Sequence, residues 1–213
     1  MPKKKRTTKA ASPGRTPLDA RETVVGLRII GGRFRGRKLQ YSGDLRTRPM
    51  KDRLREAVFN LVGPGIKGTH ALDLFAGTGA LAIEALSRGS ARATLIEQHH
   101  PTAAIIRKNL ATLGLEAQAE VVPGNVFIWF RRKPTLSEAP WAVFCSPPYD
   151  FYIERADEMH ELIAGLMEAA PAESVFVVEA DERFDFQTLP QPETWNVRSY
   201  PPAHVGIFRK REL

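Results

Sequence analysis

The stretch Asp73-Leu74-Phe75-Ala76-Gly77-Thr78-Gly79-Ala80-Leu81 passes directly from an apolar strand, expected over residues 71–75, into a helix, expected over residues 79–88. Glycines at such a turn let the backbone approach a ligand closely, and the N-terminus of the helix supplies free N–H donors. The run matches neither G-x-G-x-x-G nor G-x-x-x-x-G-K-[ST], and the Asp73 carboxylate would repel a pyrophosphate. It therefore suits a cationic or hydroxyl-rich ligand. The alternative is a tight strand-to-helix turn with an incidental acid.

Strands and helices alternate on both sides of this stretch, which predicts an α/β, Rossmann-like fold with a mostly parallel twisted sheet and helices on both faces. Further strands are expected over residues 93–97, 119–122, 141–145 and 174–179, helices over residues 101–113 and 153–169, and a closing antiparallel pair over residues 195–200 and 205–209. The carboxyl ends of parallel strands form the edge at which such sheets bind ligands.

Two polar features end other strands at this edge. Glu97 ends the second strand, about 20 residues beyond the glycine turn, and its two acceptor oxygens could bind both hydroxyls of a ribose. Ser146-Pro147-Pro148-Tyr149 follows the strand over residues 141–145. Its prolines remove backbone donors, so carbonyls and a side-chain acceptor could hold an exocyclic amine while a base stacks on Tyr149. The alternative is a Pro-Pro loop with a half-buried tyrosine.

The N-terminal part of the chain predicts a small extension of the α/β fold. Residues 27–30 and 33–39 are expected to form a hairpin around Gly31-Gly32, followed by a helix that Asp52 would cap and residues 63–65 would end. Residues 1–25 are almost free of apolar side chains before Val24 and predict a disordered basic arm. The expected division is residues 1–25, residues 26–62 and residues 63–213.

The charge of the 213-residue chain is divided unevenly between these segments. Residues 1–25 hold seven Lys or Arg and two acidic residues, residues 26–58 hold ten and three, and the remainder holds 14 and 19. A basic front on an acidic body indicates a polyanionic partner, with the arm as either a phosphate-binding tail or a solubilising extension. The hairpin and its helix would contact this partner through their exposed basic residues: Arg28, Arg33, Arg35, Arg37, Lys38 and Arg53.

Composition limits the other classes of function. With 43% hydrophobic and 26% charged residues the chain is typical of a globular protein, and no run approaches the roughly 18 apolar residues of a membrane span. The single cysteine, Cys145, excludes an intrachain disulfide and a cysteine-cluster metal site. We therefore expect a soluble cytoplasmic protein, monomeric, with no bound metal.

Together, residues 73–79, Glu97 and residues 146–149 resemble the class I S-adenosylmethionine-dependent methyltransferases that modify base amino groups. Residues 28–39 and 48–60 are similar, more narrowly, to the RsmD family, which methylates the N2 amino group of a guanine in 16S ribosomal RNA. The resemblance covers about residues 26–210. It implies S-adenosyl-L-methionine as cofactor and 16S ribosomal RNA, or the assembling small ribosomal subunit, as partner.

The resemblance also implies roles for individual residues. The cofactor-binding residues would be Asp73, Phe75, Ala76, Gly77, Thr78, Gly79, Glu97, Asn125, Arg48 and Pro49, and the catalytic residues would be Ser146, Pro147, Pro148 and Tyr149. Asn125 would bond the adenine amine, or else be a turn residue.

Position 146 departs from the family, which usually has Asp there, whereas related amino-methyltransferases have Asn. A serine hydroxyl is shorter, uncharged and a weaker acceptor. Two alternatives therefore stay open: an adenine-N6 methyltransferase on DNA or RNA, and a ribosomal RNA-binding assembly factor with little turnover.

Overall fold

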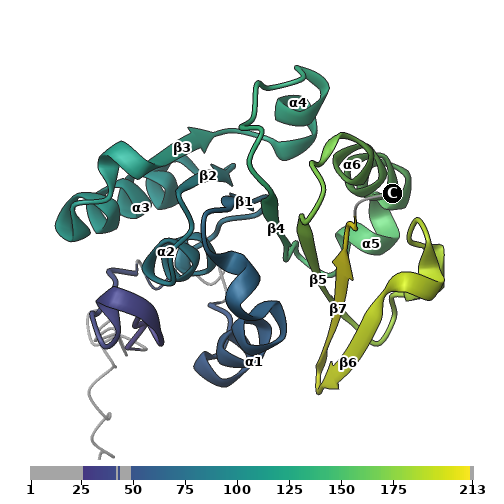
Figure 1. Cartoon of the computed structure of the whole chain (residues 1–213), viewed down its shortest axis with the longest axis horizontal. Helices are drawn as coiled ribbons and strands as arrows, with labels where there is room; N and C mark the ends of the chain where they lie inside the picture. The colour runs from purple at the N-terminus through teal and green to yellow at the C-terminus, as the bar shows by residue number, and fades with distance from the viewer. Residues whose placement is uncertain (1–25, 42, 44–48, 212–213) are drawn as a thin grey trace, which may run out of the picture.

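The protein forms one seven-stranded sheet in the order β3-β2-β1-β4-β5-β7-β6, shown by a computed structural model that describes residues 26–41, 43 and 49–211 (Figure 1). The strands are β1 (His70–Asp73), β2 (Arg92–Glu97), β3 (Ala119–Pro123), β4 (Trp141–Cys145), β5 (Val175–Asp181), β6 (Asn196–Tyr200) and β7 (Ala203–Arg209). Strands β1 to β5 pair in parallel, and β7 runs antiparallel to β5 and β6. The expected mostly parallel sheet with a closing antiparallel pair is confirmed.

Helices cover both faces of the sheet. They are α1 (Asp52–Val62), α2 (Ala80–Ser87), α3 (His100–Leu113), α4 (Val126–Arg131), α5 (Phe151–Glu154) and α6 (Ala156–Ala169). The side chains of α1, α2 and α3 share one buried cluster, and those of α4, α5 and α6 share a second cluster on the other face. No helix among the described residues is long and apolar enough to cross a membrane.

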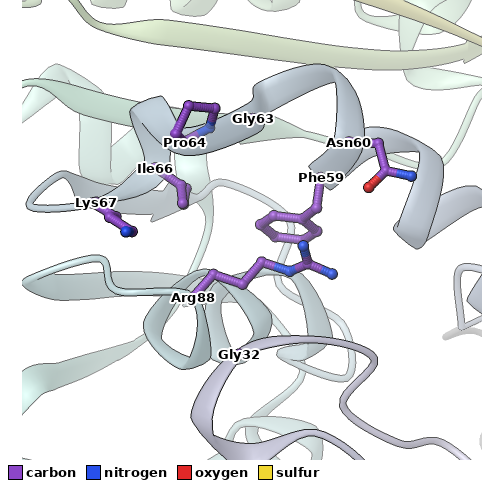
Figure 2. Close-up of a pocket in the computed structure, with 8 residues that line it drawn as sticks. All are labelled: Gly32, Phe59, Asn60, Gly63, Pro64, Ile66, Lys67 and Arg88. Atoms are coloured by element: carbon purple, nitrogen blue, oxygen red, sulfur yellow. The ribbon is translucent and has the colours of Figure 1, made fainter.

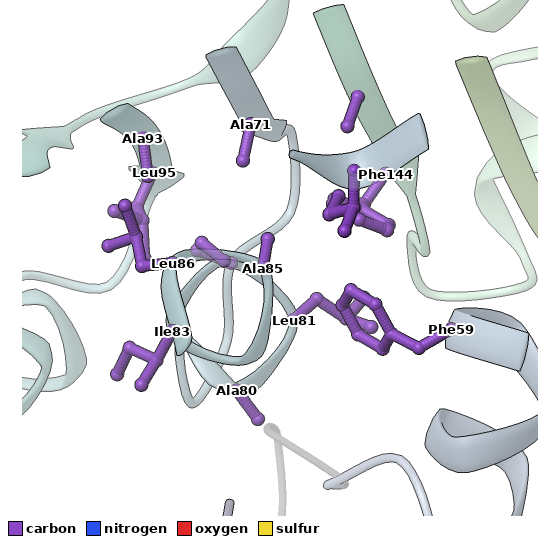
Figure 3. Close-up of a cluster of buried hydrophobic side chains, with 14 of the residues drawn as sticks. Phe59, Ala71, Ala80, Leu81, Ile83, Ala85, Leu86, Ala93, Leu95 and Phe144 are labelled. Carbon is purple, nitrogen blue, oxygen red and sulfur yellow. The ribbon is translucent and has the colours of Figure 1, made fainter. Parts of the chain in front are cut away.

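The strands supply alternate residues to these two clusters, as the two-residue period of a strand requires. In β4, Phe144 lies between the sheet and α2 and packs against Phe59 of α1, with ring centroids 5.5 Å apart (Figure 3). Val143 and Cys145 belong to the cluster on the opposite face. Helix α2 is buried along its whole length and carries mostly alanine, leucine and isoleucine. The glycine turn before α2 is therefore fixed between the sheet and a helix that has little freedom to move.

The structure differs from the sequence expectations at three places in the helices. Helix α4 was not expected, because six residues are too few to show a helical period, yet Asn125 caps it through two backbone N–H groups. The single helix expected over residues 153–169 is interrupted at Arg155, which has non-helical backbone angles between α5 and α6. Asp52 does not cap α1, since its carboxylate binds the guanidinium groups of Arg28 and Arg55 instead.

The N-terminal hairpin, residues 26–41, is a folded-back loop and not a pair of strands. Its ladder is reduced to one antiparallel bridge between Arg28 and Lys38, and the Gly31-Gly32 pair does not make the turn. Gly32 instead begins a 3-10 turn (Gly32–Phe34) with φ of +73°, and a Cβ there would lie 1.9 Å from the Ser87 carbonyl oxygen. Close contact with the end of α2 therefore replaces regular strand pairing.

Buried polar groups attach this hairpin to the rest of the molecule. The Glu84 carboxylate of α2 accepts hydrogen bonds from the backbone N–H groups of Ile30 (2.7 Å) and Gly31 (2.6 Å). Ser87 donates to the Gly31 carbonyl (2.6 Å), and Asn109 of α3 exchanges two hydrogen bonds with the backbone of Gln40. Residues 26–41 thus pack against α2 and α3. The division into units at residues 26–62 and 63–213 stays a prediction, and the expected arm, residues 1–25, lies outside the described part of the chain.

Candidate active site at the carboxyl edge of the sheet

The polar residues singled out from the sequence meet at the carboxyl edge of four neighbouring strands. Asp73 is the last residue of β1 and pairs with Leu95 of β2 and Phe144 of β4. Glu97 ends β2, and Ser146 follows β4 directly. The expectation that the glycine turn and the Ser-Pro-Pro-Tyr loop share one edge of the sheet is confirmed.

Asp73 is a buried carboxyl group with one free acceptor. Its Oδ2 accepts a hydrogen bond from the Ala82 N–H at 3.2 Å, and its Oδ1 has no partner among the described residues. Burial raises the pKa of Asp73 to about 7, and the nearby charge of Glu97 acts in the same direction, whereas the Ala82 N–H opposes them. An unpartnered buried acceptor at the first strand end fits a ligand that brings a donor or a positive charge.

Glu97 holds the glycine turn in place. Its Oε2 accepts from the Gly77 N–H and its Oε1 from the His99 N–H, both at 2.7 Å. Each carboxylate oxygen has a second lone pair, so both remain able to accept a ligand hydroxyl. Gly79 has φ of +74°, and a Cβ on it would lie 3.0 Å from Ile106 Cγ2, so glycine is required there.

The other expected cofactor residues differ in what the structure shows. Asn125 Oδ1 already accepts the N–H groups of Phe127 (2.9 Å) and Ile128 (3.2 Å), as a helix cap. The Phe75 ring lies edge-on to the ring of Phe127, with centroids 6.2 Å apart. Thr78 and Ala76 are buried in the turn, and Pro49 is half-buried before α1, whereas Arg48 lies outside the described residues. Cofactor binding by these residues stays a prediction.

The Ser-Pro-Pro-Tyr loop is anchored to a residue that the sequence did not indicate. Ser146 Oγ donates to Glu179 Oε2, and the Tyr149 hydroxyl donates to Glu179 Oε1 at 2.8 Å. Glu179 lies near the carboxyl end of β5, and its side chain is buried in spite of its charge. The sequence does show an acidic residue near the end of an otherwise apolar strand. That residue could be assigned to the site only by knowing that β5 lies beside β4.

The predicted RNA-binding residues fall into two groups. All six are exposed, but Arg28 forms an ion pair with Asp52 (2.9 Å) and lies with Arg53 near the start of α1. Arg33 donates to Gln118, and Arg37 donates to the Thr112 carbonyl at the end of α3. Because α2 and α3 run from the carboxyl edge to the opposite edge, the hairpin tip lies roughly one eight-residue helix, about 12 Å, from the candidate site.

A shallow hollow of about 370 Å³ lies between the N-terminal hairpin, α1 and the end of α2 (Figure 2). Arg88 lies beneath the Phe59 ring, with its guanidinium carbon 4.9 Å from the ring centroid, and Lys67 lines the other side. Residue 67 precedes β1, so the hollow is at the amino edge of the sheet. It is therefore separate from the candidate active site.

Comparison with known proteins places the chain in a family. The sequence model of the family described as Conserved hypothetical protein 95, the RsmD family, matches residues 27–201. The chain belongs to this family. The fold agrees, because the structure of yhhF from Escherichia coli superposes with a TM-score of 0.71 at 33% identity, over 87% of this chain and 98% of that one.

Two curated relatives carry the same description, "Ribosomal RNA small subunit methyltransferase D". The protein of Escherichia coli strain K12 is 45% identical over 123 residues, which span 58% of this chain and 60% of that protein. The protein of Haemophilus influenzae is 32% identical over 183 residues, 86% of this chain and 92% of the relative. The resemblance to the RsmD family that the sequence motifs carry is confirmed.

Proposed function

We propose that the chain is an S-adenosyl-L-methionine-dependent methyltransferase of small-subunit ribosomal RNA that acts on the N2 amino group of a guanine. The observation that carries the proposal is the convergence, at one edge of the sheet, of the open Asp73 acceptor, the glycine turn held by Glu97, and the Ser-Pro-Pro-Tyr loop. The names of the family members support ribosomal RNA methylation. The guanine-N2 target rests on the resemblance alone.

The residues at this edge fit the proposed cofactor. Asp73 Oδ1 would accept from the ammonium group of the methionine part, the glycine turn would lie against the ligand, and Glu97 would accept from the ribose hydroxyls. S-adenosyl-L-methionine, when bound, supplies a sulfonium methyl group as the electrophile.

The Ser-Pro-Pro-Tyr loop would hold the base. Enzymes that modify a base take it out of the stack, and the half-buried Tyr149 would offer the base an aromatic face to stack on. Among the described residues the Pro147 carbonyl accepts no hydrogen bond, so it and Ser146 Oγ can each take one N–H of the amine. The amine lone pair is then left for the methyl group, and rate acceleration comes from positioning.

The test is methyl transfer from radiolabelled cofactor to small ribosomal subunits, and to naked 16S ribosomal RNA, from cells that lack the gene. We expect one labelled nucleotide, identified as N2-methylguanosine by digestion and mass spectrometry. Label in N6-methyladenosine would establish the adenine alternative instead. Tight binding of RNA and cofactor without transfer, by the parent and by Ser146→Asp alike, would establish the assembly-factor alternative.

Glu97→Ala is expected to weaken cofactor binding about 10- to 150-fold, since a hydrogen bond to a charged group contributes about 1.5–3 kcal/mol. Titration calorimetry gives the dissociation constant directly. Glu116→Ala, in the exposed turn before β3, is the matched control and should bind like the parent. Unchanged affinity in Glu97→Ala would remove the ribose assignment.

Replacing Arg33, Arg35 and Arg37 together with alanine is expected to weaken RNA binding and leave cofactor affinity unchanged. Each phosphate contact contributes about one unit to the slope of log affinity against log salt, so the slope should fall by up to about three. Filter binding between about 50 and 200 mM salt measures it. Arg198→Ala on β6, at the far end of the sheet, is the control. An unchanged slope would show that the hairpin tip does not meet RNA.

A further inference from the structure

Glu179 belongs to none of the sequence motifs, yet it is the buried acidic residue to which the Ser-Pro-Pro-Tyr loop is hydrogen-bonded. Glu179 lies near the carboxyl end of β5, and the residue is 7% exposed. The two hydroxyl groups of Ser146 and Tyr149 donate to its two oxygens, and the Tyr152 hydroxyl donates to its backbone carbonyl at 3.0 Å. Within the described parts of the chain, no Lys or Arg forms an ion pair with it. A buried carboxylate with hydroxyl partners and no cation is costly, which calls for a role.

The direction of the first hydrogen bond decides what Ser146 can offer to a substrate. A serine hydroxyl has one proton and two lone pairs, and an ionised carboxylate can only accept. Because the Ser146 hydroxyl uses its one hydrogen in the hydrogen bond to Glu179, Oγ can offer only its lone pairs to any other partner. Hydrogen bonds in a chain polarise one another, so the bond to Glu179 also makes Oγ a better acceptor.

We propose that Glu179 is a positioning residue for the amine that is methylated. It fixes Ser146 Oγ as an acceptor and places a negative charge one hydrogen bond away from it. The inference rests on the proposed function, because it needs an amine as the methyl acceptor.

The pair also provides a path for the proton that the reaction releases. In methyl transfer the amine lone pair would bond to the methyl carbon while the carbon–sulfur bonding pair returned to sulfur, which would leave a positive charge on the nitrogen. One N–H bond then breaks, and its electrons stay on nitrogen. The proton passes to Ser146 Oγ as the serine proton passes to Glu179, whose carboxylate becomes a neutral acid and later gives the proton to water.

Glu179→Gln tests this role with a side chain of the same shape. Ser146 and Tyr149 donate to different oxygens of Glu179, and glutamine has an NH2 group, which cannot accept, in place of one of these oxygens. At saturating cofactor and RNA we expect kcat to fall about 5- to 150-fold, the range for one hydrogen bond of the transition state. The KM for RNA and the cofactor dissociation constant should stay at the parent values, because the contact strengthens as charge develops on the nitrogen.

A double-mutant cycle with Ser146→Asp separates positioning from a merely structural role. In Ser146→Asp two carboxylates lie side by side, and like charges oppose each other. Glu179→Gln should therefore raise kcat in this background, or leave it unchanged, whereas it lowers kcat in the parent. Ser146→Ala is a second variant that breaks the same chain of hydrogen bonds, and it should lower kcat by a similar factor without any change at Glu179.

Glu182→Gln, at an exposed acid three residues beyond Glu179, is the matched control and should retain the parent kcat. Melting temperature and cofactor affinity are measured for every variant. If Glu179→Gln lowered kcat equally in the parent and in Ser146→Asp, or did not lower it in the parent, the inference would be overturned while the proposed function stands. Absence of methyl transfer by both the parent and Ser146→Asp would overturn the proposed function and this inference with it.

Discussion

Glu84→Ala is expected to lower the free energy of unfolding by about 3–5 kcal/mol, the cost of removing one member of a buried charge network. For a chain of this size the melting temperature should fall roughly 2–4 °C per kcal/mol. Glu84 is fully buried in α2, and both its oxygens are occupied. The loss should appear in thermal and in urea unfolding alike.

The magnitude follows from what the alanine would leave behind. The backbone N–H groups of Ile30 and Gly31 and the Arg88 guanidinium (2.8 Å) would lose their acceptor. Arg55, also fully buried, has its Nε 4.0 Å from Glu84, and that atom has no hydrogen-bond partner in the described part of the chain. Removing Glu84 therefore leaves two backbone donors without their acceptor, and leaves Asp52 as the nearest acidic partner of the buried Arg55. Unsatisfied buried donors cost more than the hydrogen bonds themselves contribute.

Glu56→Ala is the matched control, because Glu56 is exposed on the neighbouring helix α1 and its removal should change stability by less than about 0.5 kcal/mol. A second consequence separates local from global loss. Since Glu84 holds the hairpin backbone, Glu84→Ala protein that is still folded should bind RNA more weakly than the parent does, while its affinity for the cofactor stays the same. Equal stability of the two variants would show that the hairpin is held by its apolar contacts, Leu27, Ile29 and Leu39.

The position of the candidate active site was largely predictable because it follows from strand direction. Parallel strands end at one edge, so Asp73, Glu97 and Ser146 could be brought together from their positions at three strand ends. No side-chain contact was needed for that step. The glycine turn was predictable for the same reason, because its backbone demands are local.

What could not be predicted depends on contacts between distant parts of the chain. Ser146 and Glu179 are 33 residues apart, and they meet because β4 and β5 are neighbours in register, with Cys145 opposite Val178. The prediction of a turn at Gly31-Gly32 was wrong for a similar reason. The Gly31 N–H donates to Glu84 of α2, which is 53 residues away in the sequence. A motif read locally cannot show which distant group completes its hydrogen bonds.

Asp73→Asn is expected to weaken cofactor binding by about 2–5 kcal/mol, roughly 30- to 4,000-fold, because it removes one partner of a buried charge pair. The asparagine can keep the hydrogen bond from the Ala82 N–H, but its amide donor would then face the cofactor ammonium. Asp157→Asn, exposed on α6, is the matched control and should bind cofactor like the parent. Calorimetry near pH 7.5 measures both.

The pH dependence gives this prediction a sign that a packing defect would not share. Burial raises the pKa of Asp73 to about 7 from the ordinary 3.8, so the folded protein holds this proton more tightly than the unfolded chain does. The parent should therefore lose stability as pH rises from about 4 to 7, and Asp73→Asn should be the more stable protein above pH 7.

Cofactor affinity should depend on pH in the opposite direction, because the ammonium group of the cofactor favours the ionised carboxylate. The affinity of the parent should rise between about pH 5.5 and 7.5, with release of a proton on binding, whereas the affinity of the asparagine variant should not change with pH. A variant that is more stable above pH 7 yet binds cofactor poorly assigns Asp73 to the ligand. A parent profile as flat as that of the variant would mean that Asp73 stays neutral and that the ammonium is bound elsewhere.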